Sequence, residues 1–136
     1  MSTTAIAEAY FQALNRGDVD GALACFAPGA TFVSPMGPLP LPDGVRAYLN
    51  GFEQSFPRAQ VQVTKAMEAG EAVALEATWT GTHAGALHVP DGRTIPATNR
   101  QVSAPFAGIF QVHGGKIVAH RAYWDLAAFM AQLTSP

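Results

Sequence analysis

The first part of the chain has hydrophobic residues at helical spacing. Apolar side chains recur at intervals of three and four from Ile6 onward, which predicts a helix that begins at a cap within Ser2–Thr4 and ends at Gly17. Asp18 is typical of an N-terminal cap, so we expect a second, short helix that Pro28–Gly29 stops. The inward side chains of this second helix would be Leu23 and Phe26.

A proline-rich segment separates a short predicted strand from a third helix. The strand covers residues 30–34, and residues 35–42 contain four prolines, which predict a stiff loop without regular structure. Asp43 would cap the third helix, and Pro57 would close it. The apolar face of this helix consists of Val45, Tyr48, Leu49, Phe52 and Phe56. The proline-rich segment is either a lid over a binding site or a rigid connector.

Beyond residue 58 the hydrophobic residues alternate with polar ones, as they do in strands. The predicted strands cover residues 59–67, 72–82, 101–112 and 116–124. The first two are joined by a turn at Glu68–Glu71 and the last two by a hairpin at His113–Gly115, while residues 84–99 form a long connection with a turn at Pro90–Gly92. Asp125 would cap a closing helix over residues 126–133.

This order of elements indicates an α+β fold in a single domain that spans residues 1–136. We expect three N-terminal helices packed on a curved antiparallel sheet, followed by a short C-terminal helix. Helices and sheet each have an apolar surface, and packing one on the other buries both. A strongly bent sheet wrapped on helices encloses a cone, and the mouth of the cone is a natural small-molecule site.

The composition provides a generous core and excludes two classes of partner. Hydrophobic residues make up 49% of the chain and charged residues 13%, which fits an internal apolar cavity or an apolar face covered by a second subunit. We therefore expect a homodimer that covers the outer face of the sheet. A net charge of −2 without a cluster of Lys or Arg excludes nucleic acid. No apolar run approaches the ~18 residues that span a bilayer, so we expect a cytoplasmic protein with no membrane partner.

We expect neither a metal ion nor a cofactor. Cys25 is the only cysteine, which excludes an internal disulfide and a cysteine metal cluster. His83, His88 and His120 do not have the spacing of metal ligands. The glycines at 114 and 115 fit a hairpin turn rather than a phosphate-binding loop.

Four segments carry a resemblance to a known superfamily: Tyr10–Asp18, Thr78–His83, Pro90–Arg93 and Gly114–Asp125. Together with the order of elements, they resemble the nuclear-transport-factor-2-like superfamily and, within it, the SnoaL-like polyketide cyclase group. The last segment also resembles limonene-epoxide hydrolases, and the first is similar to ketosteroid isomerases. The resemblance implies a cone-shaped α+β barrel, a fold that hosts several chemistries.

The catalytic carboxylates of these three families have no counterpart in this chain. The cyclase aspartate corresponds to Ala122, and the isomerase base corresponds to Ser34. The other corresponding positions are held by Ala77, Trp79 and Gly108. Proton abstraction and water activation need a titratable group at the reacting atom, so none of these mechanisms is expected to run here as it does in the family. Only the isomerase tyrosine is retained, as Tyr10.

Two residues remain as catalytic candidates. His120 shares one strand face with Ala122 and Trp124, and histidine titrates near neutrality, so it is a candidate general acid/base. The alternative is a histidine at the cavity rim that bonds backbone or water. Tyr10 is a candidate hydrogen-bond donor to a carbonyl oxygen, and the alternative is an aromatic side chain on the packed face of a helix.

Other residues are candidates for contact with a small hydrophobic ligand. They are Ser34, Met36, Trp79, His83, Phe106, Phe110, Trp124 and Asp125. The aromatic residues among them fit either a pocket wall or the core. His83 also fits a turn-stabilising role near a strand end, and Asp125 fits helix capping.

Two functions from different classes follow from this pattern. The first is a SnoaL-like, cofactor-free isomerase, cyclase or hydrolase that acts on a small hydrophobic carbonyl-bearing molecule. The second is a non-catalytic domain that binds a hydrophobic molecule and has lost the family's carboxylates. A third possibility is a cone filled by its own aromatic side chains, which leaves a dimer-forming domain without a ligand.

Overall fold

The computed structural model describes residues 1–134. Its helices are α1 (Thr3–Asn15), α2 (Val19–Leu23), α3 (Asp43–Ser55) and α4 (Leu126–Thr134). The strands of the large sheet are β1 (Phe26–Ser34), β2 (Gly37–Leu39), β3 (Gln60–Ala69), β4 (Ala72–Thr82), β7 (Gln101–His113) and β8 (Lys116–Trp124). A small separate sheet pairs β5 (Leu87–His88) with β6 (Thr94–Ile95).

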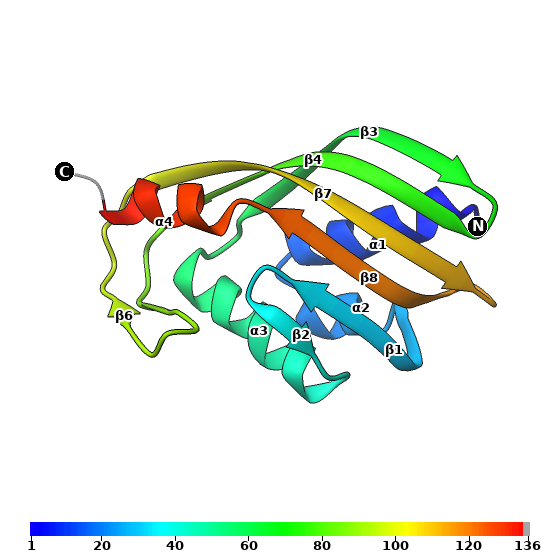
Figure 1. Cartoon of the computed structure of the whole chain (residues 1–136), viewed down its shortest axis with the longest axis horizontal. Helices are drawn as coiled ribbons and strands as arrows, with labels where there is room; N and C mark the ends of the chain where they lie inside the picture. Colours follow the sequence, from blue (N-terminus) through cyan, green and yellow to red (C-terminus); the bar gives the residue numbers. More distant parts are fainter. Residues whose placement is uncertain (135–136) are drawn as a thin grey trace.

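The large sheet is curved and has the strand order β2-β1-β8-β7-β4-β3. It arches over α1 and α2, with α3 beside them and α4 at one end (Figure 1). The predicted α+β class is confirmed, but the sheet does not close into a barrel, because β2 and β3 form its two edges. The sheet is also not wholly antiparallel as predicted: β1 runs parallel to β8. Parallel neighbours need a long connection, and here 81 residues separate the end of β1 from the start of β8.

The first two helices begin at the predicted caps. The Ala5 amide donates to the Ser2 hydroxyl oxygen at 3.0 Å, and the Gly21 amide donates to the Asp18 carboxylate at 2.8 Å. Between these helices Gly17 adopts a left-handed φ of 73°, which glycine tolerates without steric cost. The second helix is shorter than predicted: it ends at Leu23, and Phe26 begins β1.

Two segments predicted to lack regular structure contain short strands. Within residues 35–42, β2 pairs antiparallel with β1 at the edge of the sheet, where Pro38 lies opposite Val33. A proline is tolerated at an edge because one side of the strand needs no hydrogen-bond donor. Within residues 84–99, β5 and β6 form a hairpin around the predicted turn. The third helix begins at Asp43 itself, without a side-chain cap.

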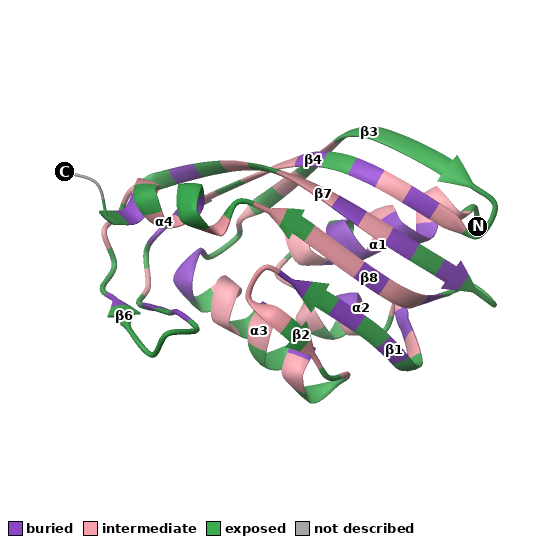
Figure 2. Cartoon of the chain, viewed as in Figure 1, coloured by how far each residue is buried: buried purple, intermediate pink, exposed green. Residues whose placement is uncertain are grey.

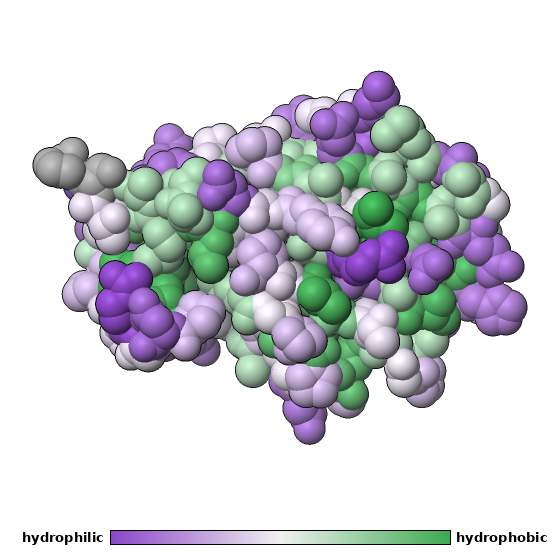
Figure 3. All heavy atoms as spheres, viewed as in Figure 1, coloured by the Kyte–Doolittle hydropathy of each residue, from purple (hydrophilic) through white to green (hydrophobic). Residues whose placement is uncertain are grey.

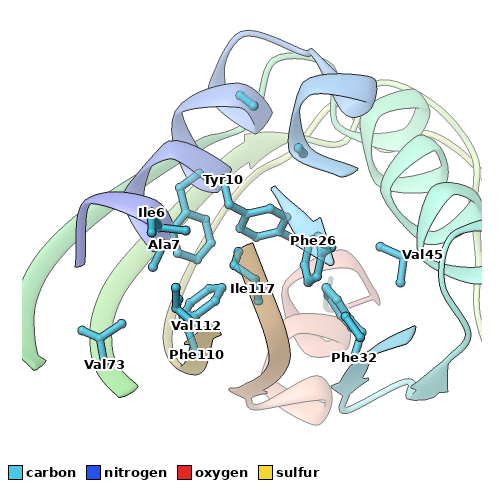
Figure 4. Packing of buried hydrophobic residues seen from close by; sticks show 14 of the residues in the cluster. Ile6, Ala7, Tyr10, Phe26, Phe32, Val45, Val73, Phe110, Val112 and Ile117 are labelled. Carbon is cyan, nitrogen blue, oxygen red and sulfur yellow. The ribbon is translucent and has the colours of Figure 1, made fainter. Parts of the chain in front are cut away.

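The main core lies between the helices and the concave face of the sheet. Buried and exposed residues alternate along the long strands, as expected for a sheet with one covered face (Figure 2). In this core Tyr10 of α1, Phe26 of β1 and Phe110 of β7 point toward one another (Figure 4). A second cluster around Phe56 and Phe129 joins α3, α4 and the β5–β6 hairpin.

The opposite, convex face of the sheet is open. Hydrophobic and hydrophilic residues are interspersed across it (Figure 3). Val33 of β1 and Tyr123 of β8 are 42% and 53% exposed. In the described part of the chain, none of the helices has the length and apolar character that crossing a membrane requires.

Candidate functional site

A cavity opens beneath the concave face of the sheet, between α1, α3 and α4. The volume of this cavity, counted as the space that the centre of a water molecule can occupy, is about 130 Å³. Ten of its twenty lining residues are Phe, Tyr or Trp, and they come from helices and strands throughout the fold. The wall is therefore a set of aromatic rings with a small number of polar atoms, which is the usual composition of a small-molecule site.

His120 lies in this wall and shares the inner face of β8 with Ala122 and Trp124, as the alternation predicted. Its ring is 2% exposed and stacks on Phe110 at a centroid distance of 3.9 Å. Nδ1 lies 3.4 Å from the Ile109 carbonyl oxygen, so this nitrogen is assigned the proton and Nε2 is left as an acceptor. Burial lowers the pKa of His120 to about 3, because the charged form would lose its hydration. The imidazole is therefore neutral at neutral pH.

Tyr10 lies close to His120 in the same wall. The two ring centroids are 5.7 Å apart, and the Tyr10 side chain is 2% exposed. Burial raises the pKa of Tyr10 well above its ordinary value, so the hydroxyl keeps its proton. Among the described residues the hydroxyl has no hydrogen-bond partner. Tyr10 and His120 thus place one free donor and one free acceptor in an apolar space.

Tyr48 is a polar residue of the wall that the sequence did not identify. Its ring packs between Phe32 and Phe52, at centroid distances of 5.6 and 5.0 Å. Burial raises the pKa of Tyr48 to about 12, while hydrogen bonding with the side chains of Ser34 and Trp124 acts against this rise. The helical pattern places Tyr48 on the apolar face of the third helix. The signal in the sequence was the tyrosine hydroxyl, on a helix face whose other side chains are hydrocarbon.

Glu53 is the second missed residue and the only carboxylate in the described wall. It is partly exposed, and its Oε1 accepts a hydrogen bond from the Arg58 amide at 3.3 Å. Phe52 and Phe56 flank it on the cavity side of α3. The available signal was an acidic residue one position after Phe52, at the edge of the predicted apolar face.

The remaining predicted contact residues divide into two groups. Trp79, Phe106 and Trp124 line the cavity. The other five do not, and they are Ser34, Met36, His83, Phe110 and Asp125. Phe110 is completely buried behind His120, because the two rings stack. Ser34 is buried against Tyr48 and also accepts from the Met36 amide at 3.1 Å.

Met36, His83 and Asp125 have positions that explain why they are outside the wall. Met36 lies in a separate groove on the other side of α3. His83 is completely buried under Phe56, and its Nδ1 accepts from the Thr98 amide at 3.2 Å. This fits the turn-stabilising alternative. Asp125 accepts a hydrogen bond from the Ala128 amide at 2.9 Å and caps α4, which fits the capping alternative.

The positions that correspond to the related families' catalytic groups are distributed over β1, β4, β7 and β8. Ala122 and Trp79 line the cavity, whereas Ala77 is buried outside it. A side chain at Gly108 would place its Cβ 3.1 Å from both the His120 and the Phe110 rings. Glycine at this position therefore leaves room for the stacked pair. Among residues 1–134 there is no group of three or more His, Cys, Asp or Glu side chains arranged to hold a metal ion.

Comparisons with solved structures agree on the fold. AclR from Streptomyces galilaeus, a proposed hydroxylase, superposes with a TM-score of 0.85 at 23% identity, covering 98% of this chain and 96% of AclR. A proposed SnoaL-like polyketide cyclase from Jannaschia sp. CCS1 gives 0.85 at 21% identity, covering 98% and 92%. A ketosteroid-isomerase-like protein from Catenulispora acidiphila DSM 44928 gives 0.79 at 22% identity, covering 96% and 93%. At these identities the likeness concerns the fold alone.

The sequence comparisons define the family. No curated protein sequence matches this chain. The model of the SnoaL-like domain matches residues 7–120, which include most of α1, all of α2 and α3, and the sheet as far as His120. The chain belongs to the SnoaL-like domain family.

Proposed function

We propose that this SnoaL-like domain binds a small, largely hydrophobic molecule in the cavity under its sheet. The observation that carries the proposal is the aromatic wall, in which Tyr10 offers a donor and the neutral His120 an acceptor. Burial of apolar ligand surface contributes roughly 25 cal/mol per Å². The two polar groups would orient a ligand that has one hydrogen-bonding function.

The neutral state of His120 favours a binding function over acid/base catalysis. With a pKa of about 3, His120 is not in the imidazolium form that acts as a general acid near neutral pH, and the neutral ring is a weak base. Ala122, beside it on the same face of β8, supplies no titratable group. The polar atoms at this end of the cavity therefore suit recognition of a ligand better than proton transfer.

A cofactor-free isomerase, cyclase or hydrolase is the second candidate, and Tyr10 favours it. A protonated, unpartnered hydroxyl in an apolar space can stabilise negative charge that develops on a carbonyl oxygen. In this form of the hypothesis, Tyr10 is the electrophilic donor for a carbonyl-bearing substrate. Tyr10→Phe would then abolish turnover and change ligand affinity only a few-fold.

The tryptophans provide a direct assay for binding. The chain has two, Trp79 and Trp124, and both line the cavity. Steroid, polyketide and terpenoid ligands should be titrated while tryptophan fluorescence and the midpoint of thermal unfolding are recorded. A ligand that binds only the folded state raises that midpoint.

A pair of matched substitutions tests where a ligand binds. Ala122→Phe places a ring in the cavity and should abolish the fluorescence response. Ala107→Phe makes the same chemical change on β7 at a position outside the cavity wall, and it should leave the response intact. Equal binding by both variants, or no binding of any ligand by the unmodified protein, would contradict the proposal.

A further inference from the structure

We propose that the ligand of this cavity is a hydrophobic organic cation, either a protonated amine or a quaternary ammonium compound. The inference rests on the proposed binding function and specifies its ligand class. The first observation is the charge of the wall. Glu53 contributes a carboxylate, and the described wall contains no Lys or Arg. Within the wall an anionic ligand would meet a like charge, whereas a cation would meet the opposite charge.

The carboxylate of Glu53 lies near one basic side chain, that of Arg58, without forming an ion pair with it: a Cβ at Gly17 would lie 3.1 Å from Glu53 Oε1 and 3.3 Å from Arg58 Nε. None of the ion pairs among the described residues includes Glu53. Its contact with Arg58 is to the backbone amide, at 3.3 Å. Glu53 also lies in the last turn of α3, where the helix dipole disfavours negative charge. Its position therefore gives α3 no electrostatic benefit and leaves the negative charge available at the cavity.

Aromatic rings line the same cavity as this carboxylate. Phe52 precedes Glu53, and its ring centroid lies 6.2 Å from Trp79 and 6.3 Å from Trp124. Phe56 is the residue directly after α3, and its ring centroid is 4.9 Å from that of Trp79. All four rings line the cavity. Aromatic faces, those of tryptophan above all, attract cations within about 6 Å of the ring centre.

The remaining polar groups of the wall do not oppose a positive charge. His120 is neutral because it is buried, and Tyr10 and Tyr48 keep their protons for the same reason. A cation in this space would thus be attracted by Glu53 and by the ring faces, and the Arg58 guanidinium beside Gly17 at the cavity edge would oppose part of this attraction. A neutral molecule of the same shape would gain only the burial of its apolar surface.

A pair of isosteric probes tests this inference. Phenyltrimethylammonium and tert-butylbenzene have the same shape and differ by one positive charge. Both would be titrated against the unmodified protein, with the fluorescence of Trp79 and Trp124 as the signal. We expect the cation to bind at least about fivefold more tightly than the neutral probe. Equal binding, or tighter binding of tert-butylbenzene, would overturn the inference and leave binding of hydrophobic molecules in place.

Substitutions identify the source of the preference. Glu53→Gln should weaken binding of the cation by about tenfold and leave the neutral probe unchanged. Glu76→Gln removes the same charge from an exposed site outside the cavity wall and should change neither affinity. Arg58→Gln removes the basic side chain nearest Gly17 at the cavity edge and should strengthen binding of the cation.

Two outcomes separate this inference from the proposed function. If Glu53→Gln leaves the ratio of the two affinities unchanged, the carboxylate does not select the ligand and the inference fails alone. If neither probe binds, and the steroid, polyketide and terpenoid ligands do not bind either, the inference and the proposed function fail together.

Discussion

The buried histidine should make the stability of the protein depend on pH. In the unfolded chain His120 titrates near its ordinary pKa of 6.5, whereas burial lowers the pKa to about 3 in the folded state. Between these two values the unfolded chain binds a proton that the folded protein does not. The part of the stability that depends on the neutral form of His120 is therefore fully present above pH 6.5 and is lost as the pH falls toward 3. Replacing His120 with Phe should remove this dependence.

The size of the effect follows from the two pKa values of His120. Each pKa unit corresponds to about 1.4 kcal/mol. Through His120 alone, the free energy of unfolding should be about 2 kcal/mol lower at pH 5 than at pH 8. The buried His83 contributes in the same direction, since burial also lowers its pKa. His83 is present in both proteins, so its contribution cancels when the unmodified protein and His120→Phe are compared.

Urea denaturation at pH 8 and pH 5, followed by tryptophan fluorescence, gives the required free energies of unfolding. The loss of stability between the two pH values should be about 2 kcal/mol larger for the unmodified protein than for His120→Phe. His120→Leu changes the packing differently but should show the same reduced pH dependence. If the unmodified protein and both variants lose equal stability between pH 8 and pH 5, then His120 is not buried in the neutral form and the reasoning is refuted.

Other predictions concern packing, capping, close approach and assembly. Phe56→Ala removes a completely buried ring and should cost about 3–5 kcal/mol in urea denaturation, whereas a loss below 1 kcal/mol would contradict its place in the core. Asp125→Ala should cost about 1 kcal/mol through loss of the α4 cap, and Asp125→Asn should restore most of it. Gly85→Ala would bring a Cβ into close contact with the backbone oxygen of Gln54, so limited proteolysis should cut the segment between β4 and β5 faster, and unchanged cleavage would show that this segment has room. The homodimer stays a prediction: Tyr123→Glu on the open face of the sheet should give a monomer in light scattering, and a monomeric unmodified protein would contradict it.

Local sequence patterns were sufficient for most elements because caps and alternation are local physics. The bounds of β4 and β8 agree with the predicted strands, and Ser2, Asp18 and Asp125 cap the helices they were predicted to cap. The parallel pairing of β1 with β8 has no local signal, since it joins segments far apart in the chain. The β2 strand was missed because propensity does not say that a proline-rich segment lies at a sheet edge.

The same holds for the candidate site: periodicity in the sequence predicts the face on which a residue lies, but not what the residue packs against. Alternation along β8 correctly placed His120, Ala122 and Trp124 on one face. Alternation does not report depth, and so it leaves Phe110 open between pocket wall and core, whereas in the structure Phe110 is completely buried beneath His120. Likewise, the helical pattern placed Tyr48 on an apolar face without showing that this face borders a cavity. Whether a side chain meets another side chain or open space depends on all the surrounding elements, and no single segment contains that information.

The position of β8 has a consequence for how the protein folds. β8 lies in the interior of the sheet between β1 and β7, yet the chain reaches it only after residue 115. Until then β1 and β2 can form a hairpin but cannot join β7, β4 and β3, because β8 lies between the two parts of the sheet. Contacts between distant segments close slowly because a long loop must be ordered first. During synthesis on the ribosome, the apolar faces of the N-terminal helices and of this hairpin would therefore stay exposed until β8 has been made. This interval of synthesis, rather than the finished structure, is when the chain depends most on protection from aggregation.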